Sequence, residues 1–193
     1  KDLHSMTAAL AANYDYDEIS AAKNADDPTQ EQKELIEVRA QMKAVGFGLL
    51  YGIGPAKLGH QLGLKVTSSL GRNGKVYEKC KEAQDLIAKY FSIYPRVKDF
   101  IEYTHELCED RLFVQTVLGR YRRLPDILSD DKGTASMARR QSVNSIIQGS
   151  AADIAITAML NCESSLDLKA LGVRMLMQIH DELVFEVPDI PEI

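Results

Sequence analysis

Two cations and two aromatic rings recur at four-residue intervals in the stretch RAQMKAVGFGLLYG. They are Arg39, Lys43, Phe47 and Tyr51, and Gly46 falls among them. On a helix each four-residue step turns a side chain by about 40°, so the four side chains share a stripe about 18 Å long. Cations at one end and rings at the other suit a ligand that is anionic at one end and flat at the other, such as a nucleoside triphosphate. Gly46 would let a ligand or another backbone approach closely. The spacing equally fits an amphipathic helix with solvated cations and buried rings.

A second polar stripe lies further along the chain. Arg140, Asn144 and Gln148 again follow at intervals of four, and the small-residue run 149–152 comes next. Side chains of these types donate hydrogen bonds to phosphates or to minor-groove acceptors, so the stripe could follow a nucleic-acid strand. The small residues would allow tight packing against a neighbour. A plain solvated helix face has the same pattern.

The tripeptide His180-Asp181-Glu182 places two carboxylates beside a histidine. Two carboxylates held close raise one another's pKa unless a cation lies between them. Mg²⁺ prefers hard oxygen ligands, and it uses one or two protein carboxylates together with phosphate and water. The tripeptide is therefore a candidate metal site, and the alternative is an ordinary exposed turn.

Two smaller motifs have both a structural and a functional interpretation. His4 lies near a helix start, where a capping role is the alternative to ligand binding. Arg120 belongs to GRYRR, a basic turn that would hold a backbone phosphate or simply be solvated.

Composition places the chain among soluble globular proteins. Its 193 residues are 45% hydrophobic and 26% charged, enough for a sizeable core. No apolar run approaches the roughly 18 residues of a membrane span, and the first residues do not form an export signal. The three cysteines are far apart and form no CxxC or Cys/His cluster, so we expect neither disulfides nor zinc, and a reducing intracellular compartment.

Charge is unevenly distributed along the chain. The formal net charge of −5 argues against a protein that simply coats nucleic acid. The segment 111–148, however, holds seven Lys/Arg and three Asp, an excess of four positive charges. An acidic chain with one basic segment can combine a cation site with a phosphate-tracking surface.

The pattern of apolar residues, caps and turns predicts a mainly helical α+β fold without a linker that divides the chain. We expect a polar connector over 15–27, and a helix over 28–51 that Asp27 caps, with Pro28 first and Gln30 completing a capping box. Further helices are predicted over 2–13, 55–61, 76–94, 95–110 and 134–160, the last capped by Thr134, with a surface loop at 68–75 that turns at Asn73-Gly74. Two short strands should turn at Gly119, and alternating apolar residues over 173–187 predict a hairpin with residues 180–182 at its tip.

Five motifs, in this order, together resemble the polymerase domain of family A DNA polymerases, the bacterial DNA polymerase I type and its phage relatives. They are DLHSMTA, RAQMKAVGFGLLYG, LGRYRRLPDI, RRQSVNSIIQGSAADI and QIHDELVFEV. The first is similar to D-I/L-H-x-x-T-A, and the second to the fingers-helix motif R-x3-K-x3-F/Y-x3-Y-G. The resemblance covers nearly the whole chain. Residues 68–75 look like an insertion, and Gly46 departs from the common Asn.

The resemblance implies a role for each residue of the first stripe. His4, Arg39 and Lys43 would contact the phosphates or sugar of the incoming nucleotide, and Lys43 would also neutralise or protonate the departing pyrophosphate. Phe47 would stack near sugar and base, and Phe at this position resembles the version that discriminates against dideoxynucleotides. Tyr51 would lie where the templating base enters.

The resemblance also implies DNA contacts and a metal site. Residues that would face primer-template DNA are Arg120, Arg140, Asn144, Gln148 and His180. Asp181 would be a catalytic metal-binding carboxylate, assisted by Glu182, on an antiparallel hairpin of the palm. The implied cofactor is Mg²⁺, with two ions in a complete enzyme.

The function implied is template-directed DNA synthesis from dNTPs on a primer–template, in the cytoplasm of a bacterium or a phage-infected host. Residues 14–110 would belong to the fingers, and residues 1–13 and 111–193 to the palm and adjoining segments. No D-Y-S-x-I/L-E-like motif with the family's first catalytic aspartate occurs. We therefore expect a partial polymerase domain without thumb, upstream motif or extreme C-terminus, which needs the remainder of that domain to polymerise.

Two other interpretations remain. A non-catalytic helical module could use the same basic faces to bind nucleic acid or a partner protein. A single-subunit RNA polymerase has similar palm and fingers, although Phe47 and the stripe of Arg140, Asn144 and Gln148 favour DNA synthesis.

Overall fold

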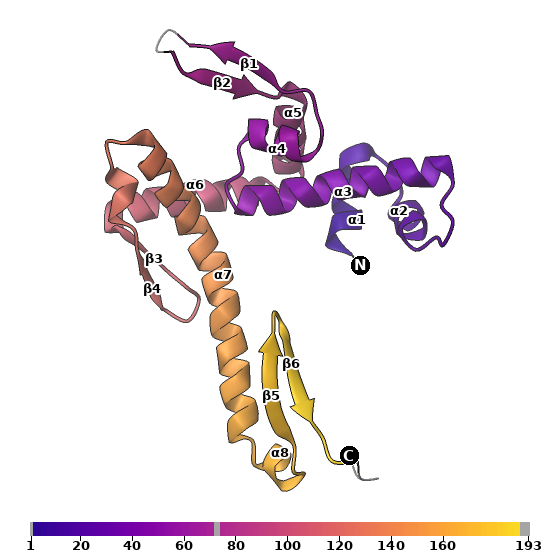
Figure 1. Ribbon diagram of the computed structural model, residues 1–193, viewed down its shortest axis with the longest axis vertical. Helices are drawn as coiled ribbons and strands as arrows, with labels where there is room; N and C mark the ends of the chain where they lie inside the picture. The colour runs from indigo at the N-terminus through magenta and orange to yellow at the C-terminus, as the bar shows by residue number, and fades with distance from the viewer. Residues whose placement is uncertain (1, 72–73, 190–193) are drawn as a thin grey trace.

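The computed structural model of the chain describes residues 2–71 and 74–189. These residues are mainly helical, with three separate two-stranded antiparallel hairpins, which confirms the predicted fold class (Figure 1). The elements are α1 (Leu3–Ala12), α2 (Tyr16–Lys23), α3 (Gln30–Leu50), α4 (Pro55–Gln61), β1 (Thr67–Leu70), β2 (Val76–Lys79), α5 (Lys81–Ile93), α6 (Pro95–Arg111), β3 (Phe113–Gln115), β4 (Tyr121–Arg123), the 3₁₀ helix η1 (Pro125–Leu128), α7 (Lys132–Ser164), α8 (Leu166–Ala170), β5 (Arg174–Ile179) and β6 (Glu182–Glu186).

Two cores hold the helical part together. The larger lies among α1 to α5 and is centred on side chains such as Ile19, Val45 and Leu58, which are fully buried. A smaller core, which includes Val114 and Ile127, joins α6 and β3 to η1 and α7. In Figure 1, α3 crosses the upper part of the molecule and α7 runs down from it, with β5 and β6 beside its lower half. The two helices that carry the polar stripes therefore belong to different cores.

The chain between α1 and α3 is more ordered than the predicted polar connector. Asp15 caps α2 and forms a capping box with Glu18. The sequence carries the signal for this helix, an acidic cap followed three residues later by Glu. The cap of α3 is Thr29, whose box partner is Gln32, so the predicted cap at Asp27 was two residues early.

The predicted helix over 76–94 was wrong in its first turn. Val76–Lys79 forms β2 and pairs with β1 in the register Leu70↔Val76. Strand β1 overlaps the start of the segment 68–75 that was predicted as a surface loop. Strand β2 ends at Lys79, and the next residue, Cys80, is fully buried against α4. A Cβ added to Gly59 of α4 would lie 2.7 Å from the Cys80 Sγ. Packing against α4 thus fixes where α5 begins. The expected turn at Asn73 lies outside the described residues.

Helix α7 begins earlier and ends later than predicted. Asp131 is its N-cap and accepts hydrogen bonds from the backbone N–H and hydroxyl of Thr134, the residue predicted to be the cap. The helix continues to Ser164, where Ser165 caps the short helix α8. Helices α4 and α6, and the β3–β4 turn at Gly119, are confirmed.

The C-terminal hairpin is confirmed, but its predicted alternation is interrupted. Met175 pairs with Phe185 and Met177 with Val184, so one extra residue, Leu176, forms a bulge. Because a bulge shifts the side-chain alternation by one residue, Met175 and Met177 face opposite sides of the hairpin rather than one side.

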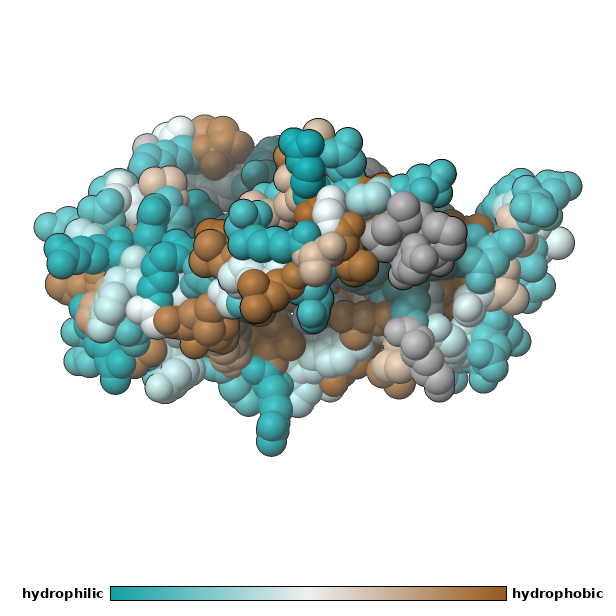
Figure 2. Space-filling model, turned by 90° about the horizontal axis from the view of Figure 1, so that it is seen from below, coloured by the Kyte–Doolittle hydropathy of each residue, from teal (hydrophilic) through white to brown (hydrophobic). Residues whose placement is uncertain are grey.

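Many large apolar side chains on α7 and the C-terminal hairpin are exposed. They are Met137, Ile147, Ile154, Ile156, Leu160, Leu176, Met177 and Ile179. Apolar patches between polar side chains are also visible on the face shown in Figure 2. By length and average composition α7 meets the requirements of a membrane span, a test that core helices of soluble proteins also meet. Its polar stripe interrupts the apolar residues, which is why the sequence shows no long apolar run.

Candidate nucleotide and nucleic-acid site

Two residues of the first stripe, Lys43 and Phe47, form a cluster with His4. The ring of His4, from α1, lies 5.3 Å from the Phe47 ring between centroids, and the Lys43 ammonium lies 5.8 Å from the same centroid. Phe47 is 44% exposed, so the ring is not buried in the core as the amphipathic-helix interpretation required. Burial lowers the pKa of His4, which keeps its imidazole neutral at pH 7. The cluster thus combines a partly exposed ring with a cation and an imidazole.

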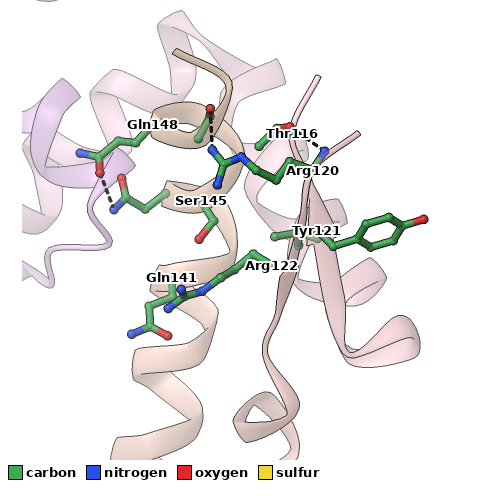
Figure 3. A pocket seen from close by; sticks show the side chains of 10 residues that line it. Thr116, Arg120, Tyr121, Arg122, Gln141, Ser145 and Gln148 are labelled. Atoms are coloured by element: carbon green, nitrogen blue, oxygen red, sulfur yellow. Dashed lines mark hydrogen bonds between the residues drawn. The ribbon is translucent and has the colours of Figure 1, made fainter. Parts of the chain in front are cut away.

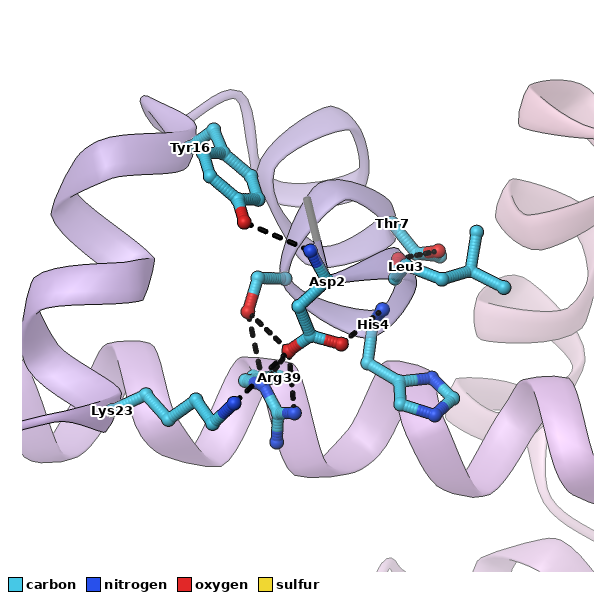
Figure 4. Close-up of polar contacts among 8 residues, drawn as sticks. Asp2, Leu3, His4, Thr7, Tyr16, Lys23 and Arg39 are labelled. Atoms are coloured by element: carbon cyan, nitrogen blue, oxygen red, sulfur yellow. Dashed lines mark hydrogen bonds and ion pairs between the residues drawn. The ribbon is translucent and has the colours of Figure 1, made fainter. Parts of the chain in front are cut away.

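Arg39 lies on α3 one turn before Lys43, and its guanidinium binds Asp2. Its Nε and one terminal nitrogen lie 3.1 Å and 2.6 Å from one Asp2 carboxylate oxygen, and Nε also donates to the Ser5 hydroxyl (Figure 4). The hydrogen bond from Arg39, followed by that from Ser5, holds the pKa of Asp2 well below its usual range. Asp2 is also the N-cap of α1, so the capping role considered for His4 belongs to Asp2 instead.

The glycines of the first stripe serve helix packing. A Cβ on Gly46 would lie 3.3 Å from the Tyr90 ring of α5, and one on Gly48 would lie 2.7 Å from Cγ2 of Ile53. The close approach expected at Gly46 is therefore made by a side chain of the same chain. The aromatic ring, and not a ligand or another backbone, occupies that space.

The two stripes meet where α3 ends against α7. The Gln148 side-chain amide donates to the Tyr51 hydroxyl at 3.1 Å, and the Asn144 side-chain amide donates to the side-chain oxygen Oε1 of Gln148 at 3.3 Å. Gly52 follows with φ +65°, and a Cβ there would lie 2.2 Å from Cγ of Arg140. A residue with a side chain would thus clash with Arg140, as well as strain the backbone. The structure places the ring end of the first stripe directly on the second stripe.

A polar pocket of about 340 Å³ lies between α7 and the β3–β4 turn (Figure 3). Gln141, Asn144 and Gln148 line it from α7, and Arg122 lines it from β4 and points toward Gln141. Amide and guanidinium donors that converge on one groove suit a backbone phosphate or base edge.

Arg120 is used mainly within the chain. Its Nε lies 2.7 Å from the buried carboxylate of Asp153, and a terminal nitrogen donates to the Gly149 carbonyl. Hydrogen bonds from Thr116 and then Arg120 lower the pKa of Asp153. The Val117 N–H also donates to Ser150, so several bonds fix the β3–β4 turn on α7. Asp153, which lies outside the segment 111–148, therefore neutralises part of the excess positive charge predicted for that segment.

The third predicted cluster stands apart. His180 and Asp181 form the two-residue turn between β5 and β6, with His180 in the left-handed region at φ 54°. Asp181 and Glu182 are exposed, and within the described ranges neither side chain makes a hydrogen bond or an ion pair. Their oxygens are ligands that Mg²⁺ prefers. Among the residues the structure describes, however, no third acidic, His or Cys side chain joins them, so the donor set fits only part of a two-ion centre.

Two carboxylates that organise the site were missed from the sequence. Asp2 positions Arg39, and Asp153 positions Arg120, each across more than thirty residues. The signal available for Asp2 was its position just before a helix, where Asp is a preferred cap. Nothing in the local sequence of Asp153 indicates its partner.

The family to which the chain belongs follows from comparison with known proteins. The family model for DNA polymerase family A matches residues 1–191, and the chain belongs to this family. It is 35% identical to DNA polymerase I of Caldicellulosiruptor bescii over 187 residues. This aligned region covers 97% of this chain and 19% of that protein. It is 34% identical over 189 residues to the thermostable DNA polymerase I of Thermus filiformis, with 98% and 19% covered.

A solved structure is similar over the same range. The POL domain of Pol1 from M. smegmatis, in complex with DNA primer-template and dNTP, has a TM-score of 0.77 and 32% identity. The similarity covers 98% of this chain and 28% of that one. The chain thus spans about a fifth of the length of the curated relatives named above.

We expect Asp2→Asn to make the stability of the protein less dependent on pH. Because the folded-state pKa of Asp2 is lowered, its contribution is complete above the unfolded value of about 4 and is lost as pH falls further. At pH 7 the change should lower the free energy of unfolding by about 1–3 kcal/mol, the range for a hydrogen-bonded charge. Thermal unfolding measured from pH 7 to pH 2 tests this. Asp27→Asn, at an exposed carboxylate, is the control; equal pH profiles for Asp2→Asn and the wild type would contradict the assignment.

Proposed function

We propose that the chain forms the nucleotide-binding fingers and part of the palm of a polymerase that adds dNTPs to a primer 3′ hydroxyl. Residues 14–110 would supply the fingers, and residues 1–13 and 111–193 the palm and adjoining segments. The observation that carries the proposal is the Tyr51–Gln148 hydrogen bond, which joins the nucleotide stripe to the DNA stripe. A nucleotide on α3 would then lie next to a strand on α7. The solved relative, a complex with primer-template DNA and dNTP, supports this choice of ligands.

On α3 the ligand would extend from ring to cations. Phe47 offers its exposed face to sugar and base, and Lys43 and Arg39 follow toward the phosphates. His4, neutral at pH 7, can donate one hydrogen bond to a phosphate or sugar oxygen without adding charge. Lys43 is exposed and carries no ion pair among the described residues, so it is available to the departing pyrophosphate.

On α7 and the neighbouring turns the ligand would be primer-template DNA. Asn144 and Gln148 present amide groups to the pocket, and Arg140 lies one turn before them. Tyr51 would occupy the position of the templating base while it is hydrogen-bonded to Gln148, and an incoming template base would break this bond. Arg120 already binds Asp153 and the Gly149 carbonyl. It would contact a DNA phosphate only through its other guanidinium N–H groups.

The C-terminal hairpin would hold the metal. Asp181 and Glu182 would contribute oxygen ligands to Mg²⁺, which when bound stabilises the attacking and leaving oxygens of a phosphoryl transfer. His180 would face the primer. Because the described residues supply only part of a two-ion centre, we expect the chain alone not to extend primers. The exposed apolar side chains of α7 and the hairpin would pack against the remainder of the polymerase domain.

Nucleotide binding by the 193-residue chain tests the proposal. We expect a fluorescent dNTP to bind in the presence of Mg²⁺ and to bind more weakly after its removal. Lys43→Ala should weaken binding by about tenfold, the scale of one charged contact, whereas Lys89→Ala on α5 should have no effect. A chain that binds DNA but shows no Mg²⁺-dependent dNTP binding would be a nucleic-acid-binding scaffold. Primer extension by the chain alone would contradict the proposal that the rest of the polymerase domain is needed for catalysis.

A further inference from the structure

The Asp2 carboxylate lies between two cations from different helices. Arg39 of α3 binds it closely, and the Lys23 ammonium, from the last residue of α2, lies 3.6 Å from the same carboxylate oxygen (Figure 4). Ser5 and the His4 N–H donate to the carboxylate as well. The acceptor capacity of Asp2 is therefore largely taken by groups other than Lys23.

Lys23 is not explained as a structural anchor. A separation of 3.6 Å is longer than a hydrogen bond, and the Lys23 side chain is 45% exposed. Ion pairs of this kind contribute little to stability because solvent screens them. The N–H groups of the Lys23 ammonium can therefore bind a ligand, and Asp2 holds this ammonium near Arg39.

The three cations form a row along α3. Lys43 lies one turn from Arg39 on the side of Phe47, whereas Figure 4 shows the Lys23 ammonium on the side of Arg39 away from His4. Lys23 and Arg39 share the single carboxylate of Asp2, and Lys43 has no ion pair among the described residues, so the three cations carry more positive charge than this carboxylate neutralises. Neighbouring like charges repel one another, and a further anion bound among them would relieve that repulsion. The row therefore has the charge and the order of groups that suit a chain of phosphates.

We propose that Lys23 is a third phosphate-binding residue, which contacts the terminal phosphate of the nucleoside triphosphate. This rests on the proposed function, since that function places the sugar at Phe47 and the phosphates toward Arg39. Lys23 is the cation furthest along the row from Phe47, so only the longest phosphate chain reaches it. Its contribution is specific for triphosphate over monophosphate.

The test compares dNTP and dNMP binding to the 193-residue chain with Mg²⁺ present. Lys23→Ala should weaken dNTP binding by about 5- to 10-fold, the scale of a charged contact at a partly exposed position. It should leave dNMP binding unchanged. Lys23→Arg should retain most of the affinity, and thermal unfolding should show that Lys23→Ala is folded. Lys33→Ala removes a charge from α3 six residues before Arg39, on another face of the helix, and serves as the matched control.

The outcomes separate this inference from the proposed function. If Lys43→Ala weakens dNTP binding but Lys23→Ala does not, Lys23 is a surface residue and only the further inference is wrong. Equal weakening of dNTP and dNMP by Lys23→Ala also contradicts it, because the contact would then not involve the terminal phosphate. If the wild-type chain binds no dNTP at all, the proposed function and the inference both fail.

Discussion

Asp181→Asn is expected to reduce nucleotide incorporation by roughly 10²- to 10³-fold or more in a polymerase that carries this chain, the scale of losing one group that stabilises the transition state. Asparagine keeps the size and turn preference of aspartate but removes the charge that would hold Mg²⁺. Asp181 is exposed in a two-residue turn and makes no described hydrogen bond, so the substitution should leave folding intact. The measurement is single-turnover primer extension, together with DNA affinity and thermal unfolding.

The control for Asp181 lies on the same hairpin. Glu186 is also exposed and pairs with Arg174 at 3.3 Å across the strands, far from the turn. Glu186→Gln should change incorporation by less than about twofold, because exposed ion pairs contribute little. Retention of more than about a tenth of the wild-type rate by Asp181→Asn would show that this carboxylate is not the metal ligand.

Phe47→Tyr is expected to improve the use of dideoxynucleotides by about 10- to 100-fold relative to dNTPs. The added hydroxyl lies on an exposed ring beside His4 and Lys43, where we propose that the sugar binds. A dideoxynucleotide lacks the 3′ hydroxyl and the hydrogen bonds that this hydroxyl makes. A tyrosine hydroxyl at position 47 can take the place of the missing hydroxyl in such a hydrogen bond. One hydrogen bond that involves a charged group is worth about 1.5–3 kcal/mol, which corresponds to this range. Chain termination at fixed ratios of dideoxynucleotide to dNTP measures the effect.

Two variants show whether the Phe47→Tyr effect depends on the hydroxyl at this position. Phe47→Leu removes the ring and should not improve dideoxynucleotide use, since it adds no polar group. Phe91→Tyr adds the same hydroxyl on α5, at a residue outside the proposed nucleotide stripe, and should behave like the wild type. Unchanged termination by Phe47→Tyr would place the sugar elsewhere and contradict the assigned orientation of the nucleotide.

Local sequence predicted most of the helices because their signals are local. The Pro at the start of α4 and α6 and the spacing of apolar residues in α3 and α7 depend on neighbours within one or two turns. The errors occurred where tertiary contacts decide. Strand β2 replaced the first turn of a predicted helix because residues 76–79 pair with 67–70. The bulge at Leu176 depends on pairing with β6, which no local pattern shows.

By itself the sequence determined which residue types recur on each stripe and the order of motifs that resembles the polymerase family. That information is one-dimensional, because a helix repeats every 3.6 residues whatever it packs against. Only the tertiary structure decided that Arg39 is held by Asp2, that Tyr51 meets Gln148, and that Lys23 extends the row of cations. These contacts join residues from 21 to 97 positions apart, and the packing of separate helices brings them together.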